Sequence, residues 1–484
     1  MTRPANGNQP IPRLHRRTPA PKIGIVHLGL GAFFRAHGAV YIAEAMAASG
    51  GDWGILGVSL QSPHTRDHLA AQCCAYSAVE LGADGTTAQL IEVVSEVLVA
   101  SEDPQAVLAR MADPAVRIVS LTVTEKGYCH DPGTGMLNLA HPDVVADLTN
   151  AWPRTAPGFL VRALQWRRDA GLRPFTVLSC DNLPENGRLV RGIVLELAAR
   201  IDQSLADWIA TEARFPCTMV DRIVPATKPE DIAMVATLIG FDDHAPVLHE
   251  PFRQWVVEDD FVDAARPDLA AAGVQLVRDV APFEHMKLRM LNGTHSALAY
   301  LGYLAGYETI ADTVADPGFA SYIRRLWLSE IIPTVAAPTG VDLEVYADTL
   351  FARYANPAIR HRTWQIAMDG SQKLPQRLLA TLAENHANGR PSPGLHLGVA
   401  AWMRYVGGTD EKGQGIDVKD PLADKLRALC DSAGTPDKKV AALLSVREVF
   451  PQKMATALLK PVTASYKQLL KSGSRISVGE FSSE

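Results

Sequence analysis

Lys287, Asn292 and His295 are the residues of this chain whose types and spacing most directly suggest acid–base chemistry. On an α-helix, at about 100° per residue, they fall within an arc of roughly 140°, so one face could present all three. A desolvated lysine loses proton affinity and can act as a general acid or base near neutral pH. An asparagine can donate a hydrogen bond to a developing alkoxide. The alternative is an amphipathic helix whose lysine is solvated and whose other two polar groups are satisfied locally.

A glycine-containing turn near the start of the chain is the second candidate. The apolar run Ile23 to Leu28 leads directly into Gly29-Leu30-Gly31-Ala32-Phe33, which opens a helical pattern. Two glycines allow a tight turn, and the free N–H groups of a helix start can face a pyrophosphate. Phe34 replaces the third glycine of this pattern, and no carboxylate follows the second strand before Asp67, so the choice between NAD and NADP stays open. A sterically required turn is the alternative.

The elements that would position these residues change type along the chain. From Lys22 to about residue 277, short β-branched runs alternate with helical patterns, which predicts a mostly parallel sheet with crossover helices. Ligands sit outside the carboxyl ends of such strands. Glu125 and Asn182 each follow a predicted strand closely and would lie at that edge. The expected strands are Ile23 to Leu28, Gly54 to Leu60, Val116 to Val123, Phe175 to Ser179 and Met219 to Val224.

After Val277 the strand-like runs stop, and helical patterns separated by Gly, Pro and Asp follow. One helix is expected to run from near Pro282 through His295 towards Tyr303. We therefore expect an α/β fold class with two domains: a loose N-terminal arm over 1–21, an α/β domain over 22–280 and an all-α domain over 281–484. The later helical patterns are Phe319 to Ile332, Gln376 to His386, Leu397 to Val406, Pro421 to Ala433 and Met454 to Leu470.

Composition excludes several classes of function. Lys and Arg number 47 against 53 Asp and Glu, a net charge of −6, so no broad cationic surface is available for nucleic acid. No run of about 18 apolar residues is present, which argues against a membrane span. The six scattered cysteines form no CxxC pair, and no Cys-plus-His cluster has metal-ligand spacing. We expect a cytoplasmic protein without a metal, acting on a small molecule, as a monomer or small homo-oligomer.

Several motifs together resemble the long-chain mannitol dehydrogenase family over about residues 22–470. They are Gly29-x-Gly31-x-Phe33-x-Arg35-x-His37, Thr122 to Tyr128, Ser179-Cys180-Asp181-Asn182, Met219 to Ile223 and Lys287-x4-Asn292-x2-His295. The resemblance implies a Rossmann-type N-terminal domain, a C-terminal helical domain, NAD as cofactor and metal-independent catalysis. It makes Lys287 the general acid/base, Asn182 and Asn292 the oxyanion donors, and His295 a substrate-orienting residue.

The resemblance also assigns binding residues. Asp221 would contact the substrate. Residues 360–377 are most similar to the members that interconvert D-mannonate and D-fructuronate, and there Arg362 and Lys373 would clamp a carboxylate; a solvated helix face is the alternative. Other candidates are a mannitol 2-dehydrogenase, a tagaturonate reductase, or a dinucleotide sensor without turnover, which would not need Lys287, Asn182 and Asn292 together. The implied cofactor contacts are Leu28, Gly29, Leu30, Gly31, Ala32, Phe33, Arg35 and Glu125.

Overall fold

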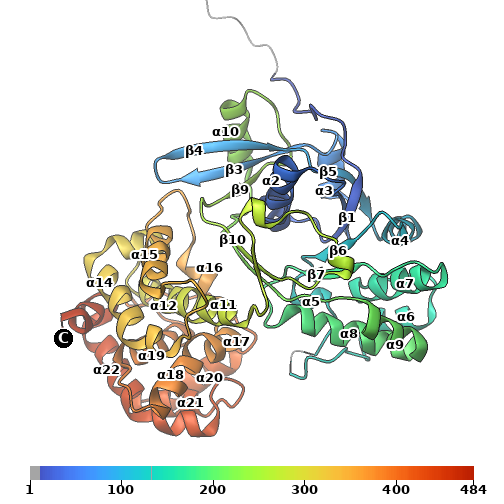
Figure 1. Ribbon diagram of the computed structural model, residues 1–484. Coiled ribbons are helices and arrows are strands. Elements are labelled where there is room, and N and C mark those ends of the chain that lie inside the picture. Colours follow the sequence, from blue (N-terminus) through green and yellow to red (C-terminus); the bar gives the residue numbers. More distant parts are fainter. Residues whose placement is uncertain (1–10, 132, 484) are drawn as a thin grey trace, which may run out of the picture. The chain divides into compact units, whose positions relative to one another are not determined.

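The computed structural model describes residues 11–131 and 133–483 (Figure 1). The chain divides into two compact units, Met1–Ala281 and Pro282–Glu484. The named strands all lie in the first unit, and the described part of the second unit consists of helices and loops. The predicted fold class, an α/β unit followed by a helical unit, is confirmed.

The centre of the first unit is a five-stranded sheet in the order β5-β2-β1-β6-β7, and every pairing in it is parallel. This order, in which the chain moves outward on one side and then returns to the other, is that of the doubly wound dinucleotide-binding fold. Its strands are β1 (Ile23–Leu28), β2 (Gly54–Ser59), β5 (Val94–Val99), β6 (Ile118–Leu121) and β7 (Thr176–Ser179).

Each face of this sheet is buried in a separate core. Val26 and Leu28 point to the face covered by α4 (Pro104–Ala112), α7 (Ala156–Asp169) and α8 (Asn186–Ile201). Ile25, on the other face, packs with residues of α2 (Gly38–Ser49). Because successive side chains of a strand point to opposite faces, these apolar runs fill both cores. The other helices of this unit are α1 (Ala32–Ala36), α3 (His64–Ala70), α5 (Thr124–Gly127), α6 (Pro142–Thr149), α9 (Gln203–Glu212) and α10 (Pro229–Ile239).

Two further sheets of three strands were not predicted as sheets. One has the order β11-β10-β8 and the other β4-β3-β9. The hairpin of β3 and β4 was missed because much of β4 is solvent-exposed and lacks the continuous apolar run of the central strands. Their strands are β3 (Tyr76–Gly82), β4 (Gly85–Ile91), β8 (Thr218–Asp221), β9 (Val247–His249), β10 (Gln254–Glu258) and β11 (Gln275–Val277).

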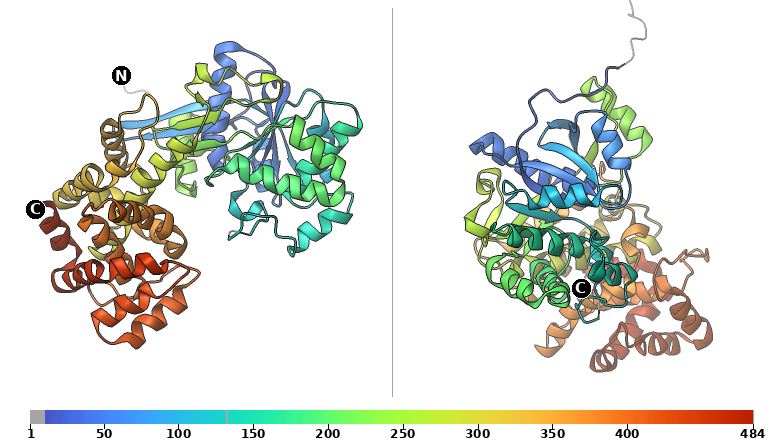
Figure 2. Two further views of the ribbon diagram at one scale, coloured as in Figure 1. Left: turned by 60° about the horizontal axis from the view of Figure 1, so that its bottom comes forward. Right: turned by 90° about the vertical axis from the view of Figure 1, so that its right-hand side faces the viewer.

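The second unit is built around α12 (Thr294–Leu304), which is buried along nearly its whole length and packs against α16 and α19. An apolar surface around the whole circumference is typical of a central helix. The last helix, α22 (Gln452–Ser483), red in Figure 2, is interrupted at Gly473 and packs against α14 and α19. The other α-helices are α11 (Ala281–Met286), α13 (Ile310–Ala315), α14 (Pro317–Arg325), α15 (Leu343–Tyr354), α16 (Thr363–Ala367), α17 (Gly370–Leu374), α18 (Ala380–Ala387), α19 (Pro393–Val406), α20 (Ala423–Ala433) and α21 (Pro436–Leu444).

The helix expected from Pro282 to Tyr303 is not a continuous α-helix. Its middle, Lys287–Gly293, is a π-helix, in which backbone hydrogen bonds join residues five apart. Side chains from other helices donate hydrogen bonds to backbone oxygens of this π-helix. Trp327 Nε1 donates to Met290 O (2.9 Å), and Tyr354 Oη donates to Leu291 O (2.9 Å). Lys287 and Asn292 are five residues apart in sequence, which is about one turn of a π-helix. The π-helix therefore brings the two side chains closer to the same side of the helix than an α-helix would.

The N-terminal arm was predicted to be loose over residues 1–21, and this is wrong for its second half. Arg13 pairs with Asp242 (3.1 Å), Leu14 is buried, and Arg16 donates to the backbone oxygens of Cys73, Glu92 and Val94. Arg13 and Arg16 therefore attach this half of the arm to the first unit. Residues 1–10 lie outside the described part.

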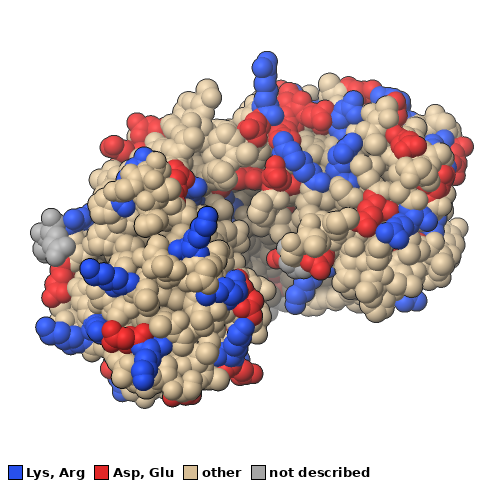
Figure 3. All heavy atoms as spheres, turned by 90° about the horizontal axis from the view of Figure 1, so that it is seen from below, with Lys and Arg blue, Asp and Glu red and all other residues tan. Residues whose placement is uncertain are grey.

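The surface agrees with the small negative net charge. On the face in Figure 3, basic and acidic side chains are interspersed on both units. Over the described residues, no helix is both long and apolar enough to cross a lipid bilayer.

Candidate active site

The carboxyl edge of the central sheet brings together the turn after β1 and the loops after β6 and β7. Gly29 has φ +90°, and a Cβ atom there would lie 2.2 Å from Thr122 O. Thr122 Oγ1 in turn donates to Gly29 O (2.8 Å). Only glycine fits this position, because the backbone is left-handed and the loop after β6 is in contact with it. The first glycine is therefore required by the protein's own packing.

Gly31 differs from Gly29 in this respect. It has φ −88° and is exposed, and the nearest atom to an added Cβ would be Gly29 O at 3.8 Å. The protein itself would thus accept a side chain here. Gly31 caps α1, whose first N–H groups have no partner within the helix. An open approach to a helix start is what a dinucleotide pyrophosphate needs, so this turn fits that group.

The missing third glycine has a structural explanation. The Phe34 ring stacks on the buried His27 ring at 3.3 Å between centroids. Gly38 leaves the space that this ring needs, because a Cβ atom at Gly38 would lie 2.5 Å from the Phe34 ring. Phe34 is thus part of the core under the turn.

The other residues predicted to contact the cofactor divide into two groups. Leu28 and Leu30 are buried in the cores, so only their backbone could face a ligand. Arg35 is turned inward: its guanidinium donates to Ala245 O (2.6 Å) and lies over the Tyr76 ring. Its prediction as a cofactor contact is wrong, because the guanidinium forms part of the protein interior. Ala32 and Phe33, in the first turn of α1, are half-buried.

Asp181 organises the residues after β6 and β7. Its carboxylate accepts hydrogen bonds from the N–H groups of Val123 and Thr124 (both 2.9 Å) and from Tyr128 Oη (2.7 Å). These bonds hold the loop that carries the exposed Glu125 next to the exposed Asn182. Asp221, at the end of β8, is buried. Asp181 was quoted in the sequence motif, but its positioning role became visible only in the structure.

In the second unit, Lys287 and His295 are both 7% exposed and Asn292 is half-buried. His295 lies against Tyr354 (ring centroids 4.6 Å apart) and meets His361 edge to face (5.0 Å). Its Nε2 is buried and has no hydrogen-bond partner among the described residues. A buried polar atom without a partner is costly, so this nitrogen is suited to a hydroxyl group of a ligand.

The titratable side chains that act on His295 are all of basic residue types. Burial lowers its pKa well below the usual value, and His361, Arg353 and Arg377 lower it further. The pKa of His361 falls to about 4, again through burial and then through Arg353, Arg377 and Lys373. His295 is therefore neutral near pH 7. We call His361, Arg353, Arg377 and Lys373 the basic cluster; the sequence analysis had selected only Lys373 of these four.

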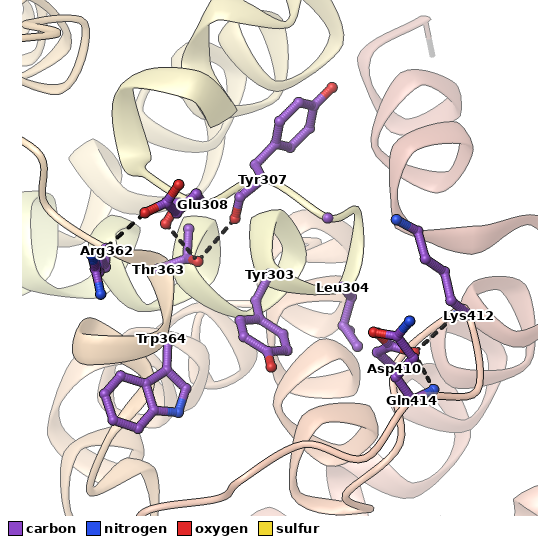
Figure 4. A pocket seen from close by; sticks show the side chains of 11 residues that line it. Tyr303, Leu304, Tyr307, Glu308, Arg362, Thr363, Trp364, Asp410, Lys412 and Gln414 are labelled. Carbon is purple, nitrogen blue, oxygen red and sulfur yellow. Dashed lines mark hydrogen bonds and ion pairs between the residues drawn. The ribbon is translucent and has the colours of Figure 1, made fainter.

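Arg362 does not face the same side as His361. The backbone at Arg362 is extended and bridges Thr309, and successive side chains of an extended segment point to opposite sides. Arg362 is half-exposed, lies 3.5 Å from Glu308 and lines a separate cavity of about 400 Å³ near the carboxyl end of α12 (Figure 4). Lys373 instead donates to Met368 O (2.6 Å) and belongs to the basic cluster. The two cations expected to form one clamp are thus separated.

Metal-ligating side chains do not gather in the structure. Among the described residues, no group of three or more His, Cys, Asp or Glu side chains is placed to hold a metal ion. One spacing was overlooked in the sequence: His64 and His68 form an HxxxH pair on α3, with ring centroids 4.2 Å apart. Neither histidine of this pair is among the residues predicted to take part in catalysis.

Comparison with known proteins accounts for both units. The mannitol dehydrogenase Rossmann domain matches residues 23–271, and the mannitol dehydrogenase C-terminal domain matches residues 279–470. The chain belongs to the mannitol dehydrogenase family. The resemblance inferred from the sequence motifs is confirmed, and with it an oxidoreductase class that acts on CH–OH groups.

Relatives in this family differ in substrate. A D-mannonate oxidoreductase of Escherichia coli (strain K12) is 46% identical, with 98% of this chain and 99% of the relative covered. An uncharacterized oxidoreductase of the same organism, YeiQ, is 51% identical over 88% of this chain and 87% of its own length. The structure of Pseudomonas fluorescens mannitol 2-dehydrogenase in ternary complex with NAD and D-mannitol is 37% identical, with a TM-score of 0.84 and 98% of each chain covered.

Proposed function

We propose that this protein is an NAD-dependent oxidoreductase that interconverts D-mannonate and D-fructuronate. The observation that carries this proposal is the basic cluster beside His295, in which Arg353 and Arg377 act on both His295 and His361 and Lys373 acts on His361. Lys373 already pairs with Asp369 (3.8 Å), and a carboxylate on the substrate would add a further counter-charge beside these partly desolvated cations. The similarity to a D-mannonate oxidoreductase supports the same substrate class.

The residues of the chain then divide the chemistry as follows. Lys287 takes the proton from the reacting hydroxyl during oxidation and returns it during reduction. Asn182 and Asn292 donate hydrogen bonds to the oxygen as negative charge develops on it. The unpartnered Nε2 of neutral His295 orients a substrate hydroxyl, and Asp221 contacts the sugar chain. NAD, when bound, would supply the hydride acceptor for the carbon that bears this hydroxyl group.

The cofactor would be held at the carboxyl edge of the central sheet. Open space beside Gly31 and the start of α1 suit the pyrophosphate. A cavity of about 550 Å³ follows the ends of β2 and β5, lined in part by Gln61, Ser101 and the ion pair of Asp143 with Arg154 (3.6 Å), and would take the adenosine part. The complex of the Pseudomonas fluorescens relative with NAD supports this cofactor.

Binding of two ligands that differ only at one terminal carbon tests the proposal. D-mannonate carries a carboxylate where D-mannitol carries a hydroxymethyl group. A charge-assisted hydrogen bond contributes on the order of 1.5–3 kcal/mol, so we expect D-mannonate to bind roughly 10- to 100-fold more tightly. Calorimetric titration of the NADH complex gives both dissociation constants. Equal affinities would remove the argument from the basic cluster.

A second function, oxidation of a neutral polyol, is favoured by one observation. The fold matches mannitol 2-dehydrogenase over nearly the whole chain, and the groups put forward for catalysis need no carboxylate. The same titration separates the two functions, because a polyol dehydrogenase would bind D-mannitol at least as tightly as D-mannonate.

The Gly31→Val variant tests the cofactor turn. The structure has room for the side chain, so the variant should fold, but the valine would occupy the approach of the pyrophosphate. We expect the KM for NAD to rise by about 10-fold or more, equivalent to about 1.4 kcal/mol. Initial rates against NAD concentration measure this, with thermal denaturation as the folding control. An unchanged KM in a folded variant would place the pyrophosphate elsewhere.

A further inference from the structure

A second cavity in the first unit has a concentration of arginines. It has a volume of about 270 Å³ and is lined by Arg117, Arg167 and Arg173, by Asp263, and by apolar residues including Leu172 and Val262. Arg117 directly precedes β6, and Arg173 comes shortly before β7. The cavity therefore lies at the amino edge of the central sheet, opposite the edge that carries Gly31, and no step of the proposed reaction uses it.

Two of these arginines have no acidic partner. Among the described residues, no carboxylate oxygen lies within 4.0 Å of the guanidinium nitrogens of Arg117 or Arg167. Arg167 is 3% exposed, and backbone oxygens hold its guanidinium: Nε donates to Arg173 O (2.6 Å) and Nη1 to Val116 O (2.8 Å). Carbonyl oxygens satisfy the hydrogen bonds of a guanidinium but do not neutralise its charge.

Arg117 is held in place by contacts that do not use all of its N–H donors. Its guanidinium lies over the Trp53 ring at 3.5 Å from the centroid, and Nη2 donates to Asp52 O. Its Nε is buried and has no acceptor among the described residues. Burial lowers the pKa of both Arg117 and Arg167, the latter to about 10, and outweighs the opposite effect of Asp52 on Arg117 and of Asp113 on Arg167.

The third arginine is already paired. Arg173 donates to Asp263 (3.0 Å) and also pairs with Glu212. Asp263 is the acidic side chain that lines the cavity; Asp52 acts on Arg117 and Asp113 on Arg167 without lining it, so within the described part of the chain neither arginine has a carboxylate in direct contact. A planar fork of donors suits an oxyanion, and a cavity of this size is small for a whole cofactor.

We propose that the cavity lined by Arg117, Arg167 and Arg173 is a second binding site that takes a phosphate group, either as inorganic phosphate or as the end of a phosphate monoester. The phosphate accepts from the guanidinium groups, and Leu172 and Val262 offer an apolar wall to whatever the phosphate is attached to. The site is distinct from the turn at Gly31, because it lies at the opposite edge of the sheet.

Calorimetric titration of the full chain with sodium phosphate and with glycerol 3-phosphate, at constant ionic strength, tests this proposal. We expect saturable binding with a dissociation constant on the order of 1 mM or lower. Equal affinities mean that the phosphate alone is recognised, and tighter binding of the monoester means that the apolar wall contributes. Binding of neither compound would overturn the proposal.

Variants locate the binding. Arg173→Gln should raise the dissociation constant about 10-fold or more, and Arg117→Lys, which keeps the charge but loses the fork, should also weaken binding. Arg168→Gln is the matched control, because Arg168 is likewise paired with acidic residues, Asp169 and Asp202, but does not line the cavity. Gly31→Val should bind phosphate normally. Unchanged affinity in both Arg173→Gln and Arg117→Lys would overturn the proposal.

Discussion

The Lys287→Ala variant is expected to lose about 10²- to 10⁴-fold in kcat while keeping its fold, because removal of a general acid/base typically costs that much. The buried lysine lies on the π-helix about one turn from Asn292, so the two side chains project from nearly the same side of the helix. Oxidation of D-mannonate at saturating NAD measures kcat, and circular dichroism checks the fold.

A control and a rescue distinguish catalysis from structure. His285→Ala changes an exposed residue of α11 near Lys287 and should leave kcat within a factor of two. A small primary amine added to Lys287→Ala should restore part of the rate if the lost group transfers a proton. Turnover of Lys287→Ala close to that of the unaltered protein would remove the lysine from the mechanism.

The second large effect is expected for Lys373→Met. Lys373 belongs to the basic cluster, whereas Arg362 faces Glu308 and a separate cavity. Removal of one charge-assisted contact should raise the KM for D-fructuronate roughly 10- to 100-fold and leave any reduction of fructose nearly unchanged. Initial rates with NADH and each substrate measure both values.

Arg362→Gln is the matched control for Lys373→Met. It removes a cation from the same stretch of sequence but not from the basic cluster, so its effect on the KM for D-fructuronate should be within a factor of about two, as for a half-exposed ion pair. Equal losses for both substrates in Lys373→Met would mean that the lysine does not read the carboxylate.

Much of the first unit could be predicted from the sequence because its central strands are buried on both faces. Ile23–Leu28 was predicted with its observed bounds, and β2, β6 and β7 differ from their predictions by one or two residues at an end. The edge strand β5 was not predicted, because Ser95 and Glu96 interrupt its apolar run. The outer hairpin was missed because β4 has no continuous apolar run. A local apolar pattern therefore identifies fully buried strands, including β8 of an outer sheet, but not the partly exposed strands β4 and β5.

Predictions for the candidate site depended on long-range contacts that spacing cannot give. The π-helix at Lys287–Gly293 depends on Trp327 and Tyr354, which come from other helices. Likewise, Arg35 has the sequence position of a cofactor contact, but Ala245, more than 200 residues away, receives its hydrogen bond. Motif matching identified the segment in each case, and packing decided what its side chains contact.

The basic cluster is the clearest example. His361 and Arg362 are neighbours in a cationic run, and only the extended backbone, with its bridge to Thr309, turns one toward His295 and the other toward Glu308. From the sequence, Arg362 was selected and His361 was not, because the direction of each side chain depends on which strand or helix the segment meets.

Selection of a sugar acid by the basic cluster can be measured as the ratio of kcat/KM for D-fructuronate to kcat/KM for fructose, with NADH and the unaltered protein. We expect a ratio of roughly 10 to 100 or more, corresponding to about 1.5–3 kcal/mol of transition-state binding. A ratio near one, or a preference for fructose, would contradict this selection.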